Sequence, residues 1–503
     1  MKSGVLGKAG RLACAIVVSL GVLLTMGRSD TWAAVRQTLG EAYEYDRGSP
    51  AALPQAATTI YLPFVARYYD GRIPPFGVQF FPPPTGPRLT YAAKAGVRWI
   101  RKPISWSVVE RTNTTPDNYN WSSTDSWVIE ATQEGVHLIL TLQGQPSWAA
   151  IYPQGPVTNT QDLLEFVGAL VERYDGDGVD DASGSPVVQH FELYNEQDNY
   201  TKVLAERGGW GIWGHNGAGY AELLQALHPV VKAASPDAKL VFGGIALDWF
   251  EDEGGPHVRE FLDDVLRACE GQDCFDVMNF HYYPPFRGVW EQYGAGIIGK
   301  ASYVRQKLAE YGFADDTPLI CTEMGWSSDP PPSGDELQSR YACKGYVRAM
   351  AADLGVAIWY QIEDMPGELW LMGLLDGDLQ PKPSYTAYRT AAELLAGARY
   401  QQVLTFTVAS TATVAVSGQP LIYDYVFERH GRRLDVVWTE DEIWPPYDPY
   451  DDPVLPLTVS VARLRVLDKF GNETWVNDED DGTADGHVTI DVSGSPLYLE
   501  YYP

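Results

Sequence analysis

The chain has 503 residues, of which 45% are hydrophobic, 12% are aromatic and 20% are charged, and its formal net charge at pH 7 is −29. This length predicts two or three domains with a large core. The strong negative charge argues against nucleic acid or an anionic membrane as a partner, because both would repel the protein.

The first 33 residues have the pattern of a secretory signal peptide. Basic residues up to Arg11 precede an apolar run over 12–26, and Thr31 and Ala33 place small residues at the two positions that decide cleavage. The run is short for a membrane span. We therefore expect the signal to be removed, with a secreted protein and no stable membrane insertion. Residues 34–74 show no clear period and are expected to form a leader.

The cysteine spacing predicts one disulfide. Cys269 and Cys274 flank four residues, which is close enough for a small bridged loop in an oxidising compartment. Cys321 and Cys343 are also able to pair. We favour a free, buried thiol at Cys321, because alternation along a strand would place it on the same inward face as Glu323.

Short apolar runs alternate with segments of helical spacing from residue 75 onwards. The helical segments include 162–171, 220–234, 258–269, 303–311 and 336–354. Several helical segments are expected to end at a glycine before the next run, as helices commonly do, and these glycines are Gly96, Gly135, Gly312 and Gly355. Eight strand–helix repeats predict a (β/α)8 barrel, a TIM barrel, over residues 75–397. An open, doubly wound sheet is the alternative, but no glycine-rich phosphate turn follows the first run. The eight runs are 75–80, 97–104, 136–142, 188–194, 239–245, 275–280, 318–321 and 356–360.

The pattern changes after the barrel. Alternating runs separated by turn residues replace helical spacing, which predicts a small antiparallel β-sandwich over residues 398–503. A structural role is favoured over sugar binding for this domain. The expected strands are 421–428, 434–438, 457–466, 487–492 and 497–501.

Two of the barrel runs end in a glutamate. The fourth run leads to Asn195 and Glu196, and the seventh leads to Glu323. Active residues of such barrels sit at the carboxyl ends of strands, and strands four and seven face each other across the pocket. Cleavage of a glycosidic bond uses one protonated and one ionised carboxyl group, about 5 Å apart in retaining enzymes. The two glutamates therefore predict sugar-cleaving chemistry.

With these residues the barrel resembles the clan A retaining glycoside hydrolases, the "4/7 superfamily", over about residues 75–395; no individual family is assigned. The resemblance implies that Glu196 is the acid/base, that Glu323 is the nucleophile and that Asn195 binds the sugar 2-hydroxyl. Further matches at the expected strand ends are Arg101 beside the nucleophile, His281 and a tyrosine at strand six, and Trp359 as the floor of the sugar subsite.

Physical chemistry adds expectations about these residues. Arg101 should lower the pKa of Glu323 by its charge and hydrogen bonds. Tyr283 should donate to the same carboxylate, because it lies two positions from His281 and so on the same face of a strand. Glu192 should be a buried, hydrogen-bonded support. Residues near strand ends either line subsites or pack in loops: Gln145, Trp148, Trp326, Trp106 and Glu363.

One acidic loop is a candidate calcium site. Asp175, Asp177, Asp180 and Asp181 place four carboxylates within seven residues, and oxygen-rich loops suit Ca²⁺. The spacing departs from the helix–loop–helix calcium pattern, and a solvated acidic turn is the favoured alternative. No other cofactor is expected.

The sequence thus predicts a secreted retaining glycosidase that cleaves β-type bonds in a glycoside, oligosaccharide or polysaccharide, with exo action favoured. An endo-acting β-glycanase is one alternative, and a non-catalytic carbohydrate-binding barrel is another. Neither the sugar nor the oligomeric state follows from the sequence.

Overall fold

The computed structural model describes residues 73–150, 155–200, 213–270, 272–368, 370–407, 421–439 and 453–502. The predicted signal peptide and nearly all of the predicted leader lie outside these ranges. Among the described residues, no helix is both long enough and apolar enough to cross a bilayer.

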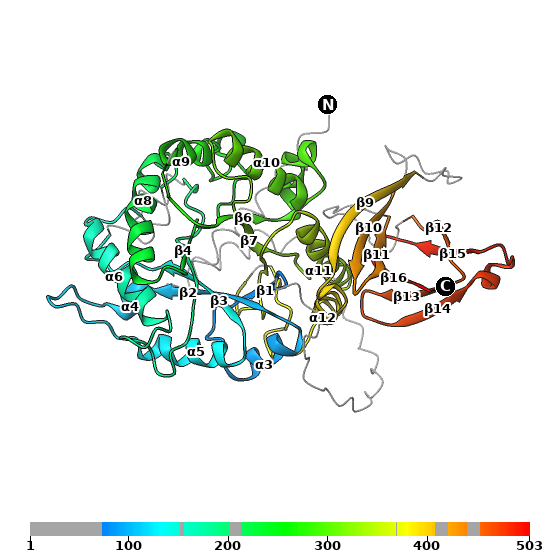
Figure 1. The fold of residues 1–503 in the computed structure, drawn as a ribbon, viewed down its shortest axis with the longest axis horizontal. Coiled ribbons are helices and arrows are strands. Elements are labelled where there is room, and N and C mark those ends of the chain that lie inside the picture. Colours follow the sequence, from blue (N-terminus) through cyan, green and yellow to red (C-terminus); the bar gives the residue numbers. More distant parts are fainter. Residues whose placement is uncertain are drawn as a thin grey trace, which may run out of the picture. The chain divides into compact units, whose positions relative to one another are not determined.

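Eight parallel strands form a barrel in the order β5-β4-β3-β2-β1-β8-β7-β6. Parallel bridges join Val241 to Val277 and Ile245 to Phe280, and so close the sheet between β5 and β6. Figure 1 shows these strands enclosed by the helices that connect them. The predicted TIM barrel is therefore confirmed. The strands are β1 Phe76–Gln79, β2 Trp99–Ser105, β3 His137–Gln143, β4 His190–Leu193, β5 Lys239–Val241, β6 Met278–Tyr282, β7 Leu319–Met324 and β8 Ala357–Trp359.

Helices cover the outside of the barrel, and side chains cap two of them. Asn159 accepts a hydrogen bond from the backbone N–H of Gln161 at the start of α6, and Asn216 accepts one from Gly219 in α8. These bonds satisfy N–H groups that have no partner within the helix. The barrel helices are α3 Gly86–Lys94, α4 Trp106–Val109, α5 Ser122–Gln133, α6 Thr160–Arg173, α8 Gly217–Ala234, α9 Phe261–Cys269, α10 Ile297–Glu310, α11 Ser333–Ala351 and α12 Pro383–Leu395, with 3-10 turns at Glu251–Glu253, Pro284–Val289 and Glu291–Tyr293.

Three of the four glycines expected after helices occupy the left-handed region. Gly96, Gly135 and Gly312 have φ values of 83°, 73° and 78°. Only glycine adopts this conformation without strain, so it ends the helix and returns the chain to the next strand. Gly355 does not have a positive φ, and Asp353 (φ 52°) occupies the left-handed region after α11 instead.

Apolar side chains fill the amino-terminal half of the barrel interior. The cluster takes residues from strands all around the barrel, so it forms a floor under the polar layer at the opposite end. Gly77 in β1 leaves room for this floor, because a Cβ there would collide with Ile358 and Trp99. The floor consists of Trp99, Ile139, Val241, Val277, Ile320, Val356 and Ile358.

The predicted disulfide and the predicted free thiol at Cys321 are both confirmed, but the inward orientation expected for Cys321 is wrong. Cys269 and Cys274 form a disulfide, and Cys321 and Cys343 are free and buried. Ile320 lies in the floor of the barrel, so alternation turns Cys321 outward rather than onto the inward face. A shift in the β7–β8 register between Cys321 and Met324 then lets Glu323 reach the interior.

The C-terminal part folds into a six-stranded antiparallel sheet, in the order β14-β13-β16-β11-β10-β9, and a two-stranded sheet, β12-β15. One apolar cluster with members from both sheets, such as Val437 and Ile490, joins them as a sandwich. The strands are β9 Arg399–Thr407, β10 Leu421–Arg429, β11 Arg432–Trp438, β12 Leu455–Ser460, β13 Arg463–Asp468, β14 Glu473–Asn477, β15 His487–Val492 and β16 Leu497–Tyr502, with a 3-10 turn at Asp478–Asp481.

Two strand expectations in this domain need correction. The run 457–466 is not one strand: it ends in one sheet at Ser460 and begins again in the other at Arg463. A change of sheet leaves the alternation of side chains nearly unbroken, so the sequence pattern does not reveal it. β9 was also missed, because its polar residues alternate weakly.

The six-stranded sheet contacts the barrel through α11. Tyr498 Oη lies 3.0 Å from Cys343 Sγ, and Arg348 Nε donates to Tyr425 Oη at 3.1 Å. The guanidinium of Arg348 also lies 5.4 Å from the ring centroid of Trp438. Because α11 is covered on both sides, 14 of its residues are buried.

Candidate active site

Glu196 lies just beyond β4, in a backbone conformation that few residues other than glycine adopt. Its φ is 50°, and that of Tyr194 is 66°. The Glu196 N–H donates to the carbonyl of Gly244 at 2.8 Å, which ties this turn to the segment after β5. Positive φ values at non-glycine residues cost free energy and cluster at functional sites. The turn holds the Glu196 side chain inward, where it is 4% exposed.

Arg101, on β2, connects the carboxylates of the polar layer. It bonds Glu192 through Nε and Nη2 at 2.7 and 2.9 Å, and Glu323 through Nη1 at 2.7 Å. Nη2 also donates to Asn195 Oδ1 at 2.6 Å. A buried cation that satisfies two carboxylates fixes their positions as well as their charge. Further bonds join Arg101 to Thr141 and Gln79.

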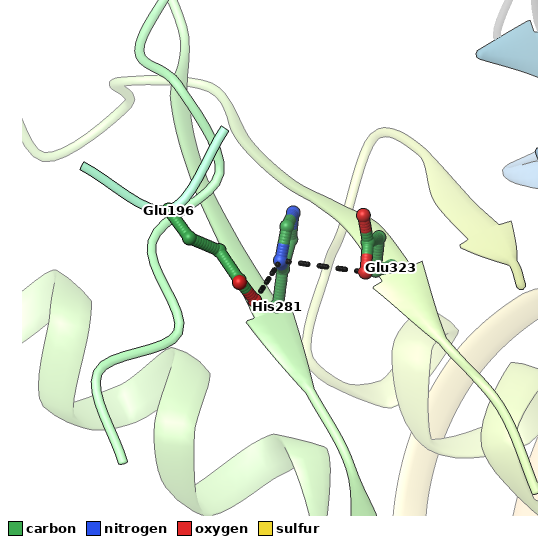
Figure 2. A group of neighbouring side chains, drawn as sticks. All are labelled: Glu196, His281 and Glu323. Atoms are coloured by element: carbon green, nitrogen blue, oxygen red, sulfur yellow. Dashed lines mark hydrogen bonds and ion pairs between the residues drawn. The ribbon is translucent and has the colours of Figure 1, made fainter. Parts of the chain in front are cut away.

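Glu323 and Glu196 face each other with His281 between them, as Figure 2 shows. Oxygens of the two carboxylates lie within 4.8 Å of each other. His281 Nδ1 is 3.0 Å from Glu196 Oε1 and 3.7 Å from Glu323 Oε2. Tyr283 Oη donates to Glu323 Oε2 at 3.0 Å. Six of the predicted site residues, including Arg101 and Asn195, are therefore brought together.

The surroundings of the two glutamates push their protonation states apart. Burial raises the pKa of Glu196 well above 4.5, and the nearby charge of Glu323 raises it further. Burial also raises the pKa of Glu323, but Arg101 and a Tyr283 hydrogen bond oppose that rise. Arg101 acts on this pKa in the expected downward direction, but burial has the larger effect, so the pKa of Glu323 is raised overall. Glu196 is thus the group that keeps a proton.

The hydrogen bonds of His281 agree with a proton on Glu196. His281 Nε2 lies 3.2 Å from Thr322 Oγ1, and that hydroxyl donates to Glu192 Oε1 at 3.1 Å. We therefore assign the imidazole proton to Nε2, which leaves Nδ1 as an acceptor for Glu196. Burial lowers the pKa of His281 well below 6.5. The ring is neutral at pH 7, so a protonated Glu196 is able to donate to it.

A buried charge cluster that the sequence analysis missed supports the Glu196 turn. Both oxygens of Asp198 accept backbone bonds, from Ala246 at 3.2 Å and Leu247 at 2.7 Å. Lys300 of α10 bonds Asp248 Oδ2 at 2.9 Å and also the carbonyl of Ala246. These contacts join the loops after β4 and β5 to α10. Asp198, Asp248 and Lys300 are far apart in the sequence and belong to no motif, so the sequence gave no signal that would have identified them.

Solved structures with a similar fold are glycoside hydrolases. One, described as a family 39 glycoside hydrolase from Bacteroides cellulosilyticus WH2, is 21% identical with a TM-score of 0.60, over 85% of this chain and 81% of that one. A glucosidase from Croceicoccus marinus is 14% identical (TM-score 0.53), and a family 51 α-L-arabinofuranosidase from Bifidobacterium longum is 15% identical (TM-score 0.54). Both of these matches cover 86% of this chain and 97% of the other.

This chain has the fold of clan A glycoside hydrolases. The matches are longer than the barrel alone, so they extend into the C-terminal sheets. No protein-family model matches the sequence, and no curated protein does.

Trp359 does not lie where the resemblance placed it. Its side chain is 0% exposed, its Nε1 donates to the carbonyl of Met372 at 2.9 Å, and its ring packs on Tyr341 of α11. A ring with no exposed face cannot form the floor of a sugar subsite. By alternation from Ile358, which lies in the floor, the neighbouring Tyr360 points into the barrel, and burial together with the charge of Glu323 raises its pKa.

The other predicted subsite residues are held in packing contacts. Trp148 donates to the carbonyl of Arg111 and packs on Trp106 at 5.4 Å between ring centroids. Gln145 donates to the carbonyl of Gly155. The remaining two are Trp326, which is 3% exposed, and Glu363, which bonds Arg88 at 2.6 Å.

Glu368, on the loop after β8, was not predicted. Gln361 Nε2 donates to Glu368 Oε2 at 2.6 Å, and burial raises the pKa of Glu368 to about 7. The charge of Glu368 also acts on Tyr360. Glu368 therefore places a half-buried carboxyl group of raised pKa on the loop after β8, close to Gln361 and Tyr360.

The acidic loop brings three of its four predicted carboxylates together. Asp175, Asp177 and Asp181 offer oxygens within 4.8 Å of one another, and Asp180 is not part of this group. The Asp181 carboxylate already accepts bonds from the N–H groups of Gly176 and Gly178. Calcium binding remains a prediction.

Glu196, His281 and Glu323 also have the composition of a metal site. The arrangement argues against that role. Arg101 and Tyr283 bond one oxygen each of Glu323, and a guanidinium 2.7 Å from a carboxylate repels a second cation. The chemistry of the site is better explained by the two glutamates alone.

Replacing Arg101 by methionine tests this network. We expect a loss of about 3–5 kcal/mol in the free energy of unfolding, because buried carboxylates lose their cation. In addition, the pKa of Glu323 should rise, so the acid limb of kcat/KM should move to higher pH. Urea unfolding and a pH–rate profile measure both effects. Arg101→Lys keeps the charge and should move the acid limb less; equal profiles for the two variants would contradict the electrostatic role.

Proposed function

We propose that the protein is a secreted retaining glycosidase that hydrolyses β-type glycosidic bonds, with Glu196 as acid/base and Glu323 as nucleophile. One observation carries this proposal: two buried carboxylates have oxygens within 4.8 Å of each other, and hydrogen bonds from Arg101 and Tyr283 oppose the rise in pKa at Glu323, whereas the charge of Glu323 adds to the rise at Glu196. Retaining enzymes hold their two carboxyl groups about 5–5.5 Å apart, whereas inverting enzymes need more room for a water molecule.

In the first step, an oxygen of ionised Glu323 attacks the anomeric carbon. Tyr283 and Arg101 hold that carboxylate by one oxygen each. As the glycosidic bond breaks, Glu196 gives its proton to the departing oxygen, so the leaving group departs neutral. The products of this step are a glycosyl ester on Glu323 and a free alcohol.

In the second step, Glu196 is ionised and acts as a base. It takes a proton from a water molecule, and the water oxygen attacks the anomeric carbon of the ester. The bond to Glu323 breaks, the sugar leaves with its original anomeric configuration, and both carboxyl groups return to their starting states. While the ester exists, Glu323 carries no charge. Arg101 still keeps a counter-ion then, because Glu192 remains bonded to it.

Exo action is the favoured form of this proposal. Glu196 and Glu323 are 4% and 8% exposed, and a substrate that enters by its end reaches such buried groups more easily than the middle of a long chain does. An endo-acting β-glycanase is the alternative. Secretion rests on the N-terminal 33 residues, and a carbohydrate is the expected substrate.

A panel of nitrophenyl glycosides tests the proposal. It should include glucosides, xylosides, galactosides and α-L-arabinofuranosides, because two similar structures are a glucosidase and an α-L-arabinofuranosidase. We expect hydrolysis of at least one member, and proton NMR of the first-formed sugar should show retained configuration. A non-catalytic carbohydrate-binding barrel would bind oligosaccharides while it hydrolyses none of them. An inverted first product would refute the two-step mechanism.

A further inference from the structure

The six-stranded sheet carries a cavity of about 330 Å³ with several arginines in its lining. We call it the arginine pocket and define it by Arg429, Arg432, Arg433, Glu500 and Tyr502. Its volume lies at the lower end of the range for ligand pockets, roughly 300–1,000 Å³. It lies at the hairpin that joins β10 to β11.

Two of these arginines oppose each other across the hairpin. Arg429 pairs directly with Arg432 in the β10–β11 register, so their side chains leave the same face of the sheet. Like charges directly opposite each other in a sheet are destabilising. A fold that keeps this pair gains from an anion placed between the two side chains.

Among the described residues, the nearby carboxylates bond other arginines and not these two, although the charges of Glu500 and Glu393 act on Arg429. Arg433 bonds Asp435 at 2.6 Å, and Glu500 bonds Arg465 at 2.7 Å. Arg429 bonds only a carbonyl, that of Glu393, and its Nε is buried without a hydrogen-bond partner. Buried polar groups normally have partners, so this Nε is an unused donor beside the cavity.

Aromatic rings adjoin the pocket. The Arg432 guanidinium lies 5.7 Å from the centroid of the Tyr502 ring, and that ring lies 5.0 Å from the ring of Trp475. Both rings are partly exposed. Aromatic rings offer an apolar surface to the C–H faces of sugars, and a guanidinium matches a carboxylate with two parallel hydrogen bonds.

We propose that the arginine pocket binds the carboxylate of an isolated uronic acid residue on a largely neutral saccharide. The net charge of −29 repels a densely charged polyanion. A single carboxylate avoids this repulsion, since charges beyond about 8 Å are screened at physiological ionic strength. The choice of a saccharide rests on the proposed glycosidase function, whereas the choice of an anion rests on the pocket.

Calorimetric titration of the full chain tests the proposal. The probe is a xylo-oligosaccharide with one glucuronic acid substituent, and its matched control is the same compound with the carboxyl group methyl-esterified. The Glu323→Gln background prevents hydrolysis during the titration. We expect the acid to bind about tenfold or more tightly than the ester, and Arg432→Gln to abolish that difference. Arg267→Gln, which changes an arginine on α9, should preserve it.

Three results would overturn the proposal: equal affinities for acid and ester, a difference that survives Arg432→Gln, or displacement of the acid by equimolar inorganic sulfate. The last would identify a general anion pocket instead. Arg432 is exposed, so its replacement should not impair folding, and a thermal melt checks this. The glycosidase proposal is tested separately, by hydrolysis of small aryl glycosides in the enzyme with Glu323 intact. Arg432→Gln should leave that hydrolysis unchanged, so a failure of one proposal is distinguishable from a failure of the other.

Discussion

Replacement of Glu323 by alanine is expected to lower kcat by a factor on the order of 10⁵ to 10⁶, as the loss of a covalent nucleophile does in other hydrolases. Without this carboxylate, no glycosyl ester forms. Arg101 and Tyr283, which each bond one of its oxygens, are left without a shared partner. Initial rates on the best nitrophenyl glycoside of the panel measure the effect.

Azide identifies the missing group. A small anion that enters the space left by the Glu323 side chain should attack the anomeric carbon of an activated aryl glycoside directly. The product should be a glycosyl azide of inverted configuration, formed at a rate that depends on azide concentration. A correctly folded Glu323→Ala variant that azide does not reactivate would count against the nucleophile assignment.

A second measurement finds the nucleophile without mutation. A 2-deoxy-2-fluoro glycoside with a good leaving group should inactivate the enzyme, because the fluorine slows both formation and hydrolysis of the ester, while the good leaving group speeds only its formation, so that the ester accumulates. Mass spectrometry of a proteolytic digest should then place the added sugar on the peptide that contains Glu323. A label on Glu192 would reverse our assignment of the supporting and reacting carboxylates.

The sequence predicted most of the residues that meet at the candidate site because they follow strands that are themselves easy to recognise. Glu196 and Glu323 each come directly after apolar runs, and a closed parallel barrel brings the ends of such runs to one mouth. Here the order of the chain alone determines proximity in space. Arg101 and His281 were instead predicted from the resemblance to clan A enzymes, and Tyr283 from its position two residues after His281.

What the sequence did not predict depends on single-residue geometry or on long-range contact. Simple alternation from Ile320 turns Cys321 outward and would turn Glu323 outward too, but a register shift in β7 lets Glu323 reach the interior. On β8 Ile358 points inward, so alternation turns Trp359 outward onto Tyr341 of α11, against the prediction that it forms the floor of a sugar subsite. Lys300 reaches Asp248 from a helix that no motif marks.

The glycine pattern illustrates the same limit. Gly96, Gly135 and Gly312 end helices by a local rule that needs no tertiary information. The positive φ values at Tyr194 and Glu196, by contrast, are imposed by the loops packed around them. Local conformations are thus predictable where the residue itself prefers them, and unpredictable where the tertiary structure maintains a strained one.

Replacement of Glu196 by glutamine should produce an effect that depends on the leaving group. Glycosides with poor leaving groups, such as disaccharides, should lose roughly 10² to 10⁴ in kcat/KM, because their departing oxygen needs a proton. Dinitrophenyl glycosides need little protonation, so their kcat/KM should change much less. Their kcat should still fall, since hydrolysis of the ester has lost its base. Azide should restore it and give a glycosyl azide of retained configuration.

The pH profile provides an independent check on this role. Glu196 acts as an acid, so activity should be lost as pH rises through its raised pKa. Glu323 acts while ionised, so activity should also be lost as pH falls through the raised pKa of this group. In Glu196→Gln the basic limb of kcat/KM should disappear and the acid limb should remain. Because burial raises both values, the wild-type optimum should lie above the range of ordinary carboxyl groups. A basic limb that persists in the variant would show that another group donates the proton.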